Sequence, residues 1–189
     1  MSYADDLLEL AQDLANFHAK SPRQANLRRA VSTAYYAIFH LLISEATLNW
    51  ARDELRDQLG RVFEHGKMKS ASENKVSDLN AYFKTNPAEG RERTIADHLG
   101  IVCNAFIQAQ QRRNDADYNT AKECTPMEVK IQIQEVTEAF QSWNVIRNEG
   151  VAQAWLVSLL FGRNERREKK ADPPATRKPR KNKPPPTAE

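Results

Sequence analysis

Arg113 is the first residue of this sequence whose position suggests chemistry. The segment before it repeats apolar residues at helical spacing: Ile95, Leu99, Val102, Phe106 and Ala109. The same spacing leads to Arg113 and then to Ala116 or Asp117, so we expect Arg113 to point inward. A guanidinium stays charged there and needs a carboxylate, a phosphate or water. Two interpretations stay open, namely a local ion pair with Asp117 and a cleft that binds a phosphate.

A second set of polar residues shares one side of an earlier helix. These four residues follow a spacing of four, three and four positions: Arg29, Thr33, Tyr36 and His40. The opposite side of the same segment is apolar: Leu27, Val31, Ala34, Ile38 and Leu41. Guanidinium, hydroxyl, phenol and imidazole groups together are able to line a groove that binds phosphate. The alternative is an ordinary solvated helix face.

Other chemistries find little support in the residues. The chain has six glycines and no glycine-rich phosphate loop, and its four histidines and two cysteines show no spacing typical of a metal site or a disulfide framework. We therefore expect no cofactor and no metal. The N-terminal stretch does not resemble a signal peptide, and the apolar run at 151–161 is about half of the ~20 residues that a membrane helix needs. A cytoplasmic protein without membrane contact is expected.

The positioning elements are expected to be helices, because apolar residues recur at helical spacing and period-two runs are missing. The first helix should span Tyr3 to Lys20 and bury one stripe: Leu7, Leu10, Leu14 and Phe17. Ser21 and Pro22 should open a second helix that ends near Asn49. A shorter helix should follow from Ala51 to Phe63, and the polar segment from Glu64 to Ser72 should be a loop.

The second half of the chain shows clearer boundaries. A short helix around Val76, Leu79 and Phe83 should end at Asn86 and Pro87, and a long helix should run from Arg93 to Tyr118. Thr125 and Glu128 form a capping box for the last long helix, which has its own apolar stripe: Val129, Ile133, Val136, Phe140 and Trp143. Gly150 should interrupt that helix, and Gly162 should stop the apolar segment after it.

Together these segments predict an all-α fold, an up-and-down bundle of four to five main helices, as one domain over residues 1–162. Residues 163–189 should form a disordered, basic, proline-rich tail, since they hold ten Lys/Arg and four Asp/Glu and few apolar residues. Two functions stay open for the tail: an electrostatic tether to nucleic acid, or a solubilising extension.

Two segments resemble the HEPN family of helical domains, in particular its small stand-alone prokaryotic members. Residues 26–40, NLRRAVSTAYYAIFH, are similar to the family's helix "RRAxSxAYYAxFH". Residues 113–118, RNDADY, resemble the family's late motif of arginine, a polar residue, three variable residues and histidine, with Tyr118 in place of the histidine. The segment around Phe63, His65 and Met68 is similar to the middle loop of one subgroup.

The resemblance implies a homodimer in which the two late motifs face each other, and many family members are metal-independent ribonucleases. Carried over, Arg113 binds the scissile phosphate, Asn114 orients it, and Tyr118 stands where the catalytic acid or base belongs. A histidine has a reference pKa of about 6.5 and a tyrosine one of about 10, so the change favours binding over cleavage. His40 or His65 is able to substitute only if the fold brings one of them close.

The leading hypothesis is therefore an RNA- or nucleotide-binding domain of a toxin–antitoxin or stress and defence system, with a degenerate ribonuclease motif. Its expected site combines two sets of residues: Arg29, Tyr36 and His40, and Arg113, Asn114 and Tyr118. One alternative is a helical assembly module that pairs with a nucleotidyltransferase-type antitoxin. Another is an active metal-independent endoribonuclease.

Overall fold

The computed structural model describes residues 2–17, 20–86 and 89–162, which form seven α-helices and one short 3₁₀ helix without a strand. In chain order the helices are α1 (Tyr3–Asn16), α2 (Gln24–Leu48), the 3₁₀ helix η1 (Asp53–Leu55), α3 (Arg56–Gly60), α4 (His65–Thr85), α5 (Gly90–Tyr118), α6 (Pro126–Ile146) and α7 (Gly150–Ser158). The predicted all-α helical bundle is confirmed. The predicted tail lies outside the described residues.

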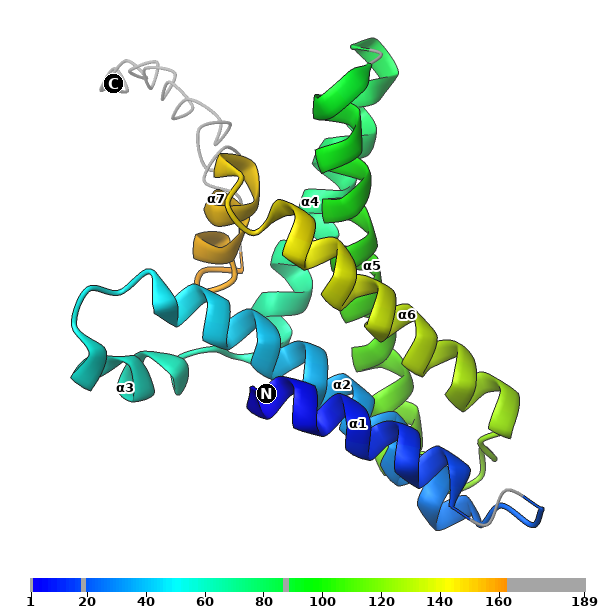
Figure 1. Ribbon diagram of the computed structural model, residues 1–189. Helices are drawn as coiled ribbons and strands as arrows, with labels where there is room; N and C mark the ends of the chain where they lie inside the picture. The colour runs from blue at the N-terminus through cyan, green and yellow to red at the C-terminus, as the bar shows by residue number, and fades with distance from the viewer. Residues whose placement is uncertain (1, 18–19, 87–88, 163–189) are drawn as a thin grey trace, which may run out of the picture.

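Helix α2 is the centre of the bundle. It packs against α1, α5 and α6, and its far end reaches the short helices α3 and α7 (Figure 1). The predicted apolar side of α2 is buried at Leu27, Val31, Ala34 and Ile38. Tyr35 is also fully buried, although a phenol there needs a partner for its hydroxyl group. The polar side predicted for α2 is thereby left toward α1 and the solvent.

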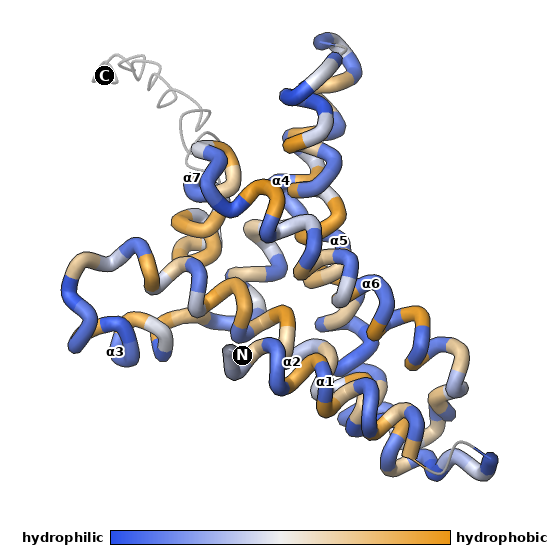
Figure 2. The backbone as a smooth tube through the Cα atoms, viewed as in Figure 1, coloured by the Kyte–Doolittle hydropathy of each residue, from blue (hydrophilic) through white to orange (hydrophobic). Residues whose placement is uncertain are grey.

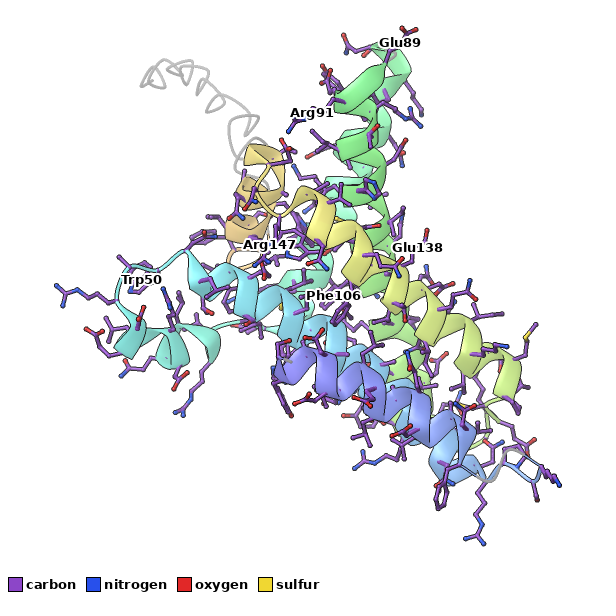
Figure 3. All side chains as sticks on the ribbon, in the orientation of Figure 1. Trp50, Glu89, Arg91, Phe106, Glu138 and Arg147 are labelled. Carbon is purple, nitrogen blue, oxygen red and sulfur yellow. The ribbon has the colours of Figure 1, made fainter. Side chains whose placement is uncertain are left out.

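Helices α5 and α6 bury the stripes that their sequences predict, except that Ile95 of α5 is only partly buried. Leu99, Val102 and Phe106 of α5 have no exposed surface, and Phe106 lies at the meeting point of the long helices (Figure 3). On α6 all five predicted positions are buried, and Trp143 packs against Trp155 of α7 with ring centroids 6.1 Å apart. This core holds the C-terminal end of α5, and with it Arg113, in a defined position.

The α4–α5 hairpin extends away from the rest of the bundle as an arm. Glu89 and Arg91 lie at the outer part of this arm (Figure 3), which is mainly hydrophilic (Figure 2). Arg91 Nη2 lies 2.6 Å from Oε1 of Glu149, the residue just before α7. A salt bridge therefore links the arm to the start of α7. The buried core includes Met68 and Ala71 of α4 and positions of α5 from Leu99 to Ala116.

The expected buried stripe of the first helix is wrong at two of its four positions. Leu10 is 47% exposed and Phe17 is 57% exposed, and α1 ends at Asn16. The buried residues of α1 are Ala4, Leu8 and Ala11, which lie on an adjacent side of the helix. Small alanine side chains let α1 approach α2 closely. The gain from this close packing exceeds the gain from burying all the leucines of the predicted stripe.

The segment from Ser21 to Ser72 also departs from expectation. Helix α2 begins at Gln24 after Arg23, so Ser21 is not its N-cap. The expected helix from Ala51 to Phe63 is reduced to the short elements η1 and α3. The expected loop from Glu64 to Ser72 is the first part of α4, because its few core-facing residues, Met68, Ala71 and Ser72, recur at helical spacing between solvated polar positions.

The predicted helix boundaries near the C-terminus are largely as expected. Thr125 and Glu128 form both hydrogen bonds of the capping box at α6. The chain leaves α6 after Ile146, and Gly150 is the first residue of α7. Gly162 has a φ of 69°, a left-handed conformation that suits glycine and ends the helical segment. Within the described ranges, no helix has the length and apolar character needed to cross a membrane.

Candidate functional site

Arg113, on the last turns of α5, points toward α2 and keeps 17% of its side-chain surface exposed. Its Nη2 donates a hydrogen bond to Tyr36 Oη at 3.0 Å, and its Nη1 donates to Asn114 Oδ1 at 3.2 Å. Its Nε lies 2.7 Å from Asp117 Oδ2 but is not directed at it, so this contact is an ion pair without a hydrogen bond. The local ion pair with Asp117 is therefore present.

Asp117 joins Arg113 to the core of α2. Its Oδ1 accepts a hydrogen bond from the buried hydroxyl group of Ser32, and its side chain is 23% exposed. The carboxylate is thereby held between a hydroxyl group of one helix and a guanidinium of another. Because both charges of the pair are reachable from solvent, an added anion is able to compete with the carboxylate for Arg113.

Three tyrosine rings surround the guanidinium. The Arg113 Cζ atom lies 5.9 Å from the ring centroid of Tyr35, 5.6 Å from that of Tyr36 and 5.4 Å from that of Tyr118. Such distances allow cation–π attraction, which holds the guanidinium in place. Tyr118 is 73% exposed, so its ring is open to solvent beside Arg113. Arg113, Asn114, Tyr36 and Tyr118, four of the six expected site residues, therefore lie together.

The remaining two, Arg29 and His40, lie along a groove between α1 and α2 of about 490 Å³. The α2 wall of this groove contains all four residues of the predicted polar side: Arg29, Thr33, Tyr36 and His40. The α1 wall consists of an apolar set: Tyr3, Leu7, Leu10 and Leu14. Tyr36 belongs both to the groove and to the Arg113 cluster, while Arg113 itself does not line the groove.

The groove has an exposed, charged Arg29 at one end and a neutral His40 at the other. Arg29 is exposed and makes no ion pair or hydrogen bond with the described residues. His40 packs edge-on against Tyr3 with ring centroids 5.0 Å apart, and burial lowers its pKa. The groove therefore offers a free guanidinium, an uncharged imidazole at neutral pH and an apolar wall.

His65, the first residue of α4, also lies in this cluster. Its Nδ1 is hydrogen-bonded to the Tyr35 hydroxyl group, and its ring packs on Phe39 with centroids 4.3 Å apart. Burial, followed by the positive charges of Arg113 and His40, lowers the pKa of His65. The sequence indicated His65 as a substitute base and as part of the family-like middle loop, and it indicated no separate role for Tyr35 within the family-like helix. Their approach depends on how α4 returns to α2, which no local pattern reveals.

Arg28 is a further residue that the expected site does not include. Its Nη1 donates to the carbonyl oxygen of Ala116 at 2.6 Å, and its Nη2 donates to that of Asn119 at 3.1 Å. Nη2 also reaches the carbonyl oxygens of Thr120 and Lys122. The Ala116 carbonyl belongs to the last turn of α5, whose carbonyl groups lack helical partners, and the other three belong to the segment that follows the helix. Arg28 therefore caps the helix end that presents Arg113 and Tyr118.

Two wider grooves lie on either side of the α4–α5 arm, with volumes of about 820 and 860 Å³. Both have mixed linings, and neither is lined by any of the expected site residues. No group of three or more His, Cys, Asp or Glu side chains gathers to hold a metal ion in the described ranges. The cluster at the α2–α5 junction is therefore where the chemistry-bearing side chains meet.

We expect acid to destabilise the fold partly through His65. Its pKa is lowered on folding, so the unfolded chain binds more protons once the pH falls below about 6.5. The contribution is complete above that value and is lost as the pH falls through the folded pKa. Urea midpoints measured from pH 7.5 to 5 should fall less for His65→Gln than for the wild type. An equal fall in both proteins would contradict this assignment.

Comparisons with protein-family models, with curated proteins and with solved structures give no match to this chain.

Proposed function

We propose that this chain is a HEPN-like helical domain that binds RNA or a nucleotide at the α2–α5 junction. Its binding residues are Arg113, Asn114 and Tyr118 on α5, and Arg29, Tyr36 and His40 on α2. The observation that supports this most is the environment of Arg113, a guanidinium fixed by Tyr36 and Asn114 and partly open to solvent. As in the family it resembles, the domain acts as a homodimer, in a toxin–antitoxin or defence system.

The phosphate contact follows from the unused donors of Arg113. A guanidinium has five N–H groups, and the described contacts of its terminal nitrogens use one N–H on each. One N–H therefore remains on each terminal nitrogen as a donor for phosphate oxygens. Arg29 supplies a second positive charge along the groove, about two helical turns from Tyr36. Two separated cations suit a chain of phosphates better than a single carboxylate ligand.

The base contact follows from the exposed ring of Tyr118. Single-stranded RNA is recognised largely by bases that stack on aromatic rings, and each stacked base contributes about 1–3 kcal/mol. Tyr118 presents such a ring directly beside Arg113. Because no hydrogen bond or ring contact joins Tyr118 to His40 or His65 among the described residues, binding is favoured over cleavage. The basic tail adds affinity that weakens with salt.

Fluorescence anisotropy with a labelled single-stranded RNA tests this proposal. We expect Arg113→Ala to weaken binding about tenfold, the loss of one charge-assisted contact. Arg93→Ala is the matched control, because it removes the same charge from the exposed outer part of α5. Deleting residues 163–189 should reduce the salt dependence without removing the effect of Arg113. Binding that is indifferent to Arg113 would reject this site.

A second candidate function rests on the exposed position of Tyr118. The family's helical domains often pair with a nucleotidyltransferase-type antitoxin, and an open phenol hydroxyl is a suitable acceptor for a nucleotide. Intact mass after co-expression with the product of the neighbouring gene tests this alternative. A mass increase of one or more nucleotides, absent in Tyr118→Phe, supports it, and an unchanged mass without a complex contradicts it.

Ribonuclease activity is the third candidate. It requires that Arg113 and Tyr118 act on the scissile phosphate without metal, and it predicts products that end in 2′,3′-cyclic phosphate. Cleavage that persists in chelator and disappears in Arg113→Ala supports this function. Intact RNA after prolonged incubation with pure protein counts against it.

A further inference from the structure

The Tyr35–His65 pair has a property that the binding residues do not explain. Tyr35 is fully buried, and its hydroxyl group has one hydrogen-bond partner among the described residues, His65 Nδ1. Burial raises the pKa of Tyr35, so this hydroxyl group keeps its proton. A buried hydroxyl proton without an acceptor costs about 1–3 kcal/mol, so the direction of this hydrogen bond matters.

The direction of the bond determines which nitrogen of His65 is protonated. If Nδ1 were protonated, it would donate to the Tyr35 oxygen, and the hydroxyl proton of Tyr35 would have no acceptor. When Tyr35 donates instead, Nδ1 accepts and both groups are satisfied. The single proton of the neutral ring must then lie on Nε2. Tyr35 thereby holds His65 in one tautomer.

The Nε2–H group of His65 has no partner among the described residues. No described residue accepts a hydrogen bond from it, and Nε2 is not one of the buried atoms that lack a partner, so it is open to solvent. The ring cannot turn freely, because it packs on Phe39. The fields of Arg113 and His40 reach the ring, but no hydrogen bond joins either side chain to His65 among the described residues. The result is an uncharged donor in a restricted ring, with some contact with solvent.

We propose that His65 is a further residue of the binding site, which donates its Nε2–H to an oxygen of the phosphate held by Arg113. This inference rests on the proposed function. Tyr36 lies between Arg113 and His65. Its hydroxyl group accepts a hydrogen bond from Arg113, and its ring centroid is 6.3 Å from that of His65. The site then contacts a phosphate with a charged donor from α5 and a neutral donor from α4.

The same tautomer excludes His65 as the missing base. A general base needs a free lone pair facing the ligand, and here the lone pair of Nδ1 is occupied by Tyr35 while Nε2 presents a proton. His65 is therefore a positioning and specificity residue. It favours ligands with an exposed oxyanion, whether the phosphate belongs to RNA, to a mononucleotide or to free inorganic phosphate.

Nitrogen-15 NMR of histidine-labelled protein at pH 7.5 tests the tautomer directly. We expect Nε2 of His65 to be protonated and Nδ1 to be unprotonated. In Tyr35→Phe, which keeps the buried ring and removes the hydroxyl group, both tautomers should appear. A wild-type spectrum with the proton on Nδ1, or a Tyr35→Phe spectrum identical to that of the wild type, overturns the assignment.

Binding measurements test the contact with a matched pair of variants. The glutamine side-chain nitrogen lies near the position of the histidine Nε2, whereas that of asparagine lies near Nδ1. We expect His65→Asn to weaken RNA binding about tenfold and His65→Gln to weaken it clearly less, with thermal melting to verify that both fold. Titrations with inorganic phosphate, adenosine monophosphate and single-stranded RNA distinguish the possible sources of the phosphate.

The outcomes separate the two proposals. If Arg113→Ala weakens RNA binding and the two His65 variants bind alike, the contact of His65 is refuted and the proposed function stands. If Arg113→Ala has no effect on binding, the proposed function is refuted and this inference falls with it, even where the NMR tautomer is as expected. Loss of binding in both Arg113→Ala and His65→Asn, with retention in His65→Gln, supports both.

Discussion

Replacing Arg28 with alanine should destabilise the protein by about 2–3 kcal/mol, because several carbonyl oxygens at the end of α5 lose a charged donor. The guanidinium reaches carbonyl groups of residues 116–122 from a different helix, so no local residue takes over its role. The end of α5 should then fray, and RNA binding should fall with it, since Arg113 and Tyr118 lie on these turns. Urea unfolding and anisotropy measure the two effects.

Arg29 is the matched control, because it is the next residue and has the same charge. It makes no ion pair or hydrogen bond with the described residues, so Arg29→Ala should change stability by no more than about 0.5 kcal/mol. We expect this variant to weaken RNA binding through the loss of one phosphate contact. The two adjacent arginines therefore separate stability from binding. Equal stability of the two variants would contradict the capping role of Arg28.

Replacing Asp117 with alanine should cost about 2–3 kcal/mol of stability. Removal of one partner from a buried ion pair costs about 3–5 kcal/mol, and the partial exposure of both side chains reduces that figure. The variant also leaves the buried hydroxyl group of Ser32 without its acceptor. Asp117→Asn should cost less, because its amide oxygen is still able to accept from Ser32.

The Asp117→Ala variant should also gain affinity for phosphate. Without the carboxylate, Arg113 has one competitor fewer, and an added anion is able to take its place. Phosphate should therefore raise the melting temperature of Asp117→Ala more than that of the wild type, at matched ionic strength against chloride. If phosphate stabilises both proteins equally, Arg113 does not bind the anion, and the ion pair with Asp117 is its whole role.

These results would describe a site assembled from three helices. Helix α5 supplies Arg113 and Tyr118, and α4 supplies His65. Tyr35 and Tyr36 of α2 connect the two, since Tyr35 bonds to His65 and Tyr36 bonds to Arg113. Tyr35 and Tyr36 are consecutive residues on α2, yet one is buried against His65 and the other bonds to Arg113. A change of packing between α2 and α4 would therefore alter the site without touching any residue of the late motif on α5.

The helical fold could be predicted because its signals are local. The stripe through Leu99, Val102 and Phe106 and the capping box of Thr125 and Glu128 lie within single helices, where the α-helical repeat places the residues on one side. The inward direction of Arg113 and its pairing with Asp117 follow from the same repeat. Each of these features depends on residues no more than a few turns apart.

Other features depended on how the helices pack. The core uses the alanine side of α1 and leaves Leu10 exposed, because the fit against α2 decides between two apolar sides. The approach of His65 to Tyr35 and the capping of α5 by Arg28 join residues 30 and about 90 positions apart. Periodicity within one helix determines which side of that helix is apolar. Only the packing of helices on one another determines which distant side chains share a hydrogen bond, and here that packing places a neutral imidazole beside the guanidinium.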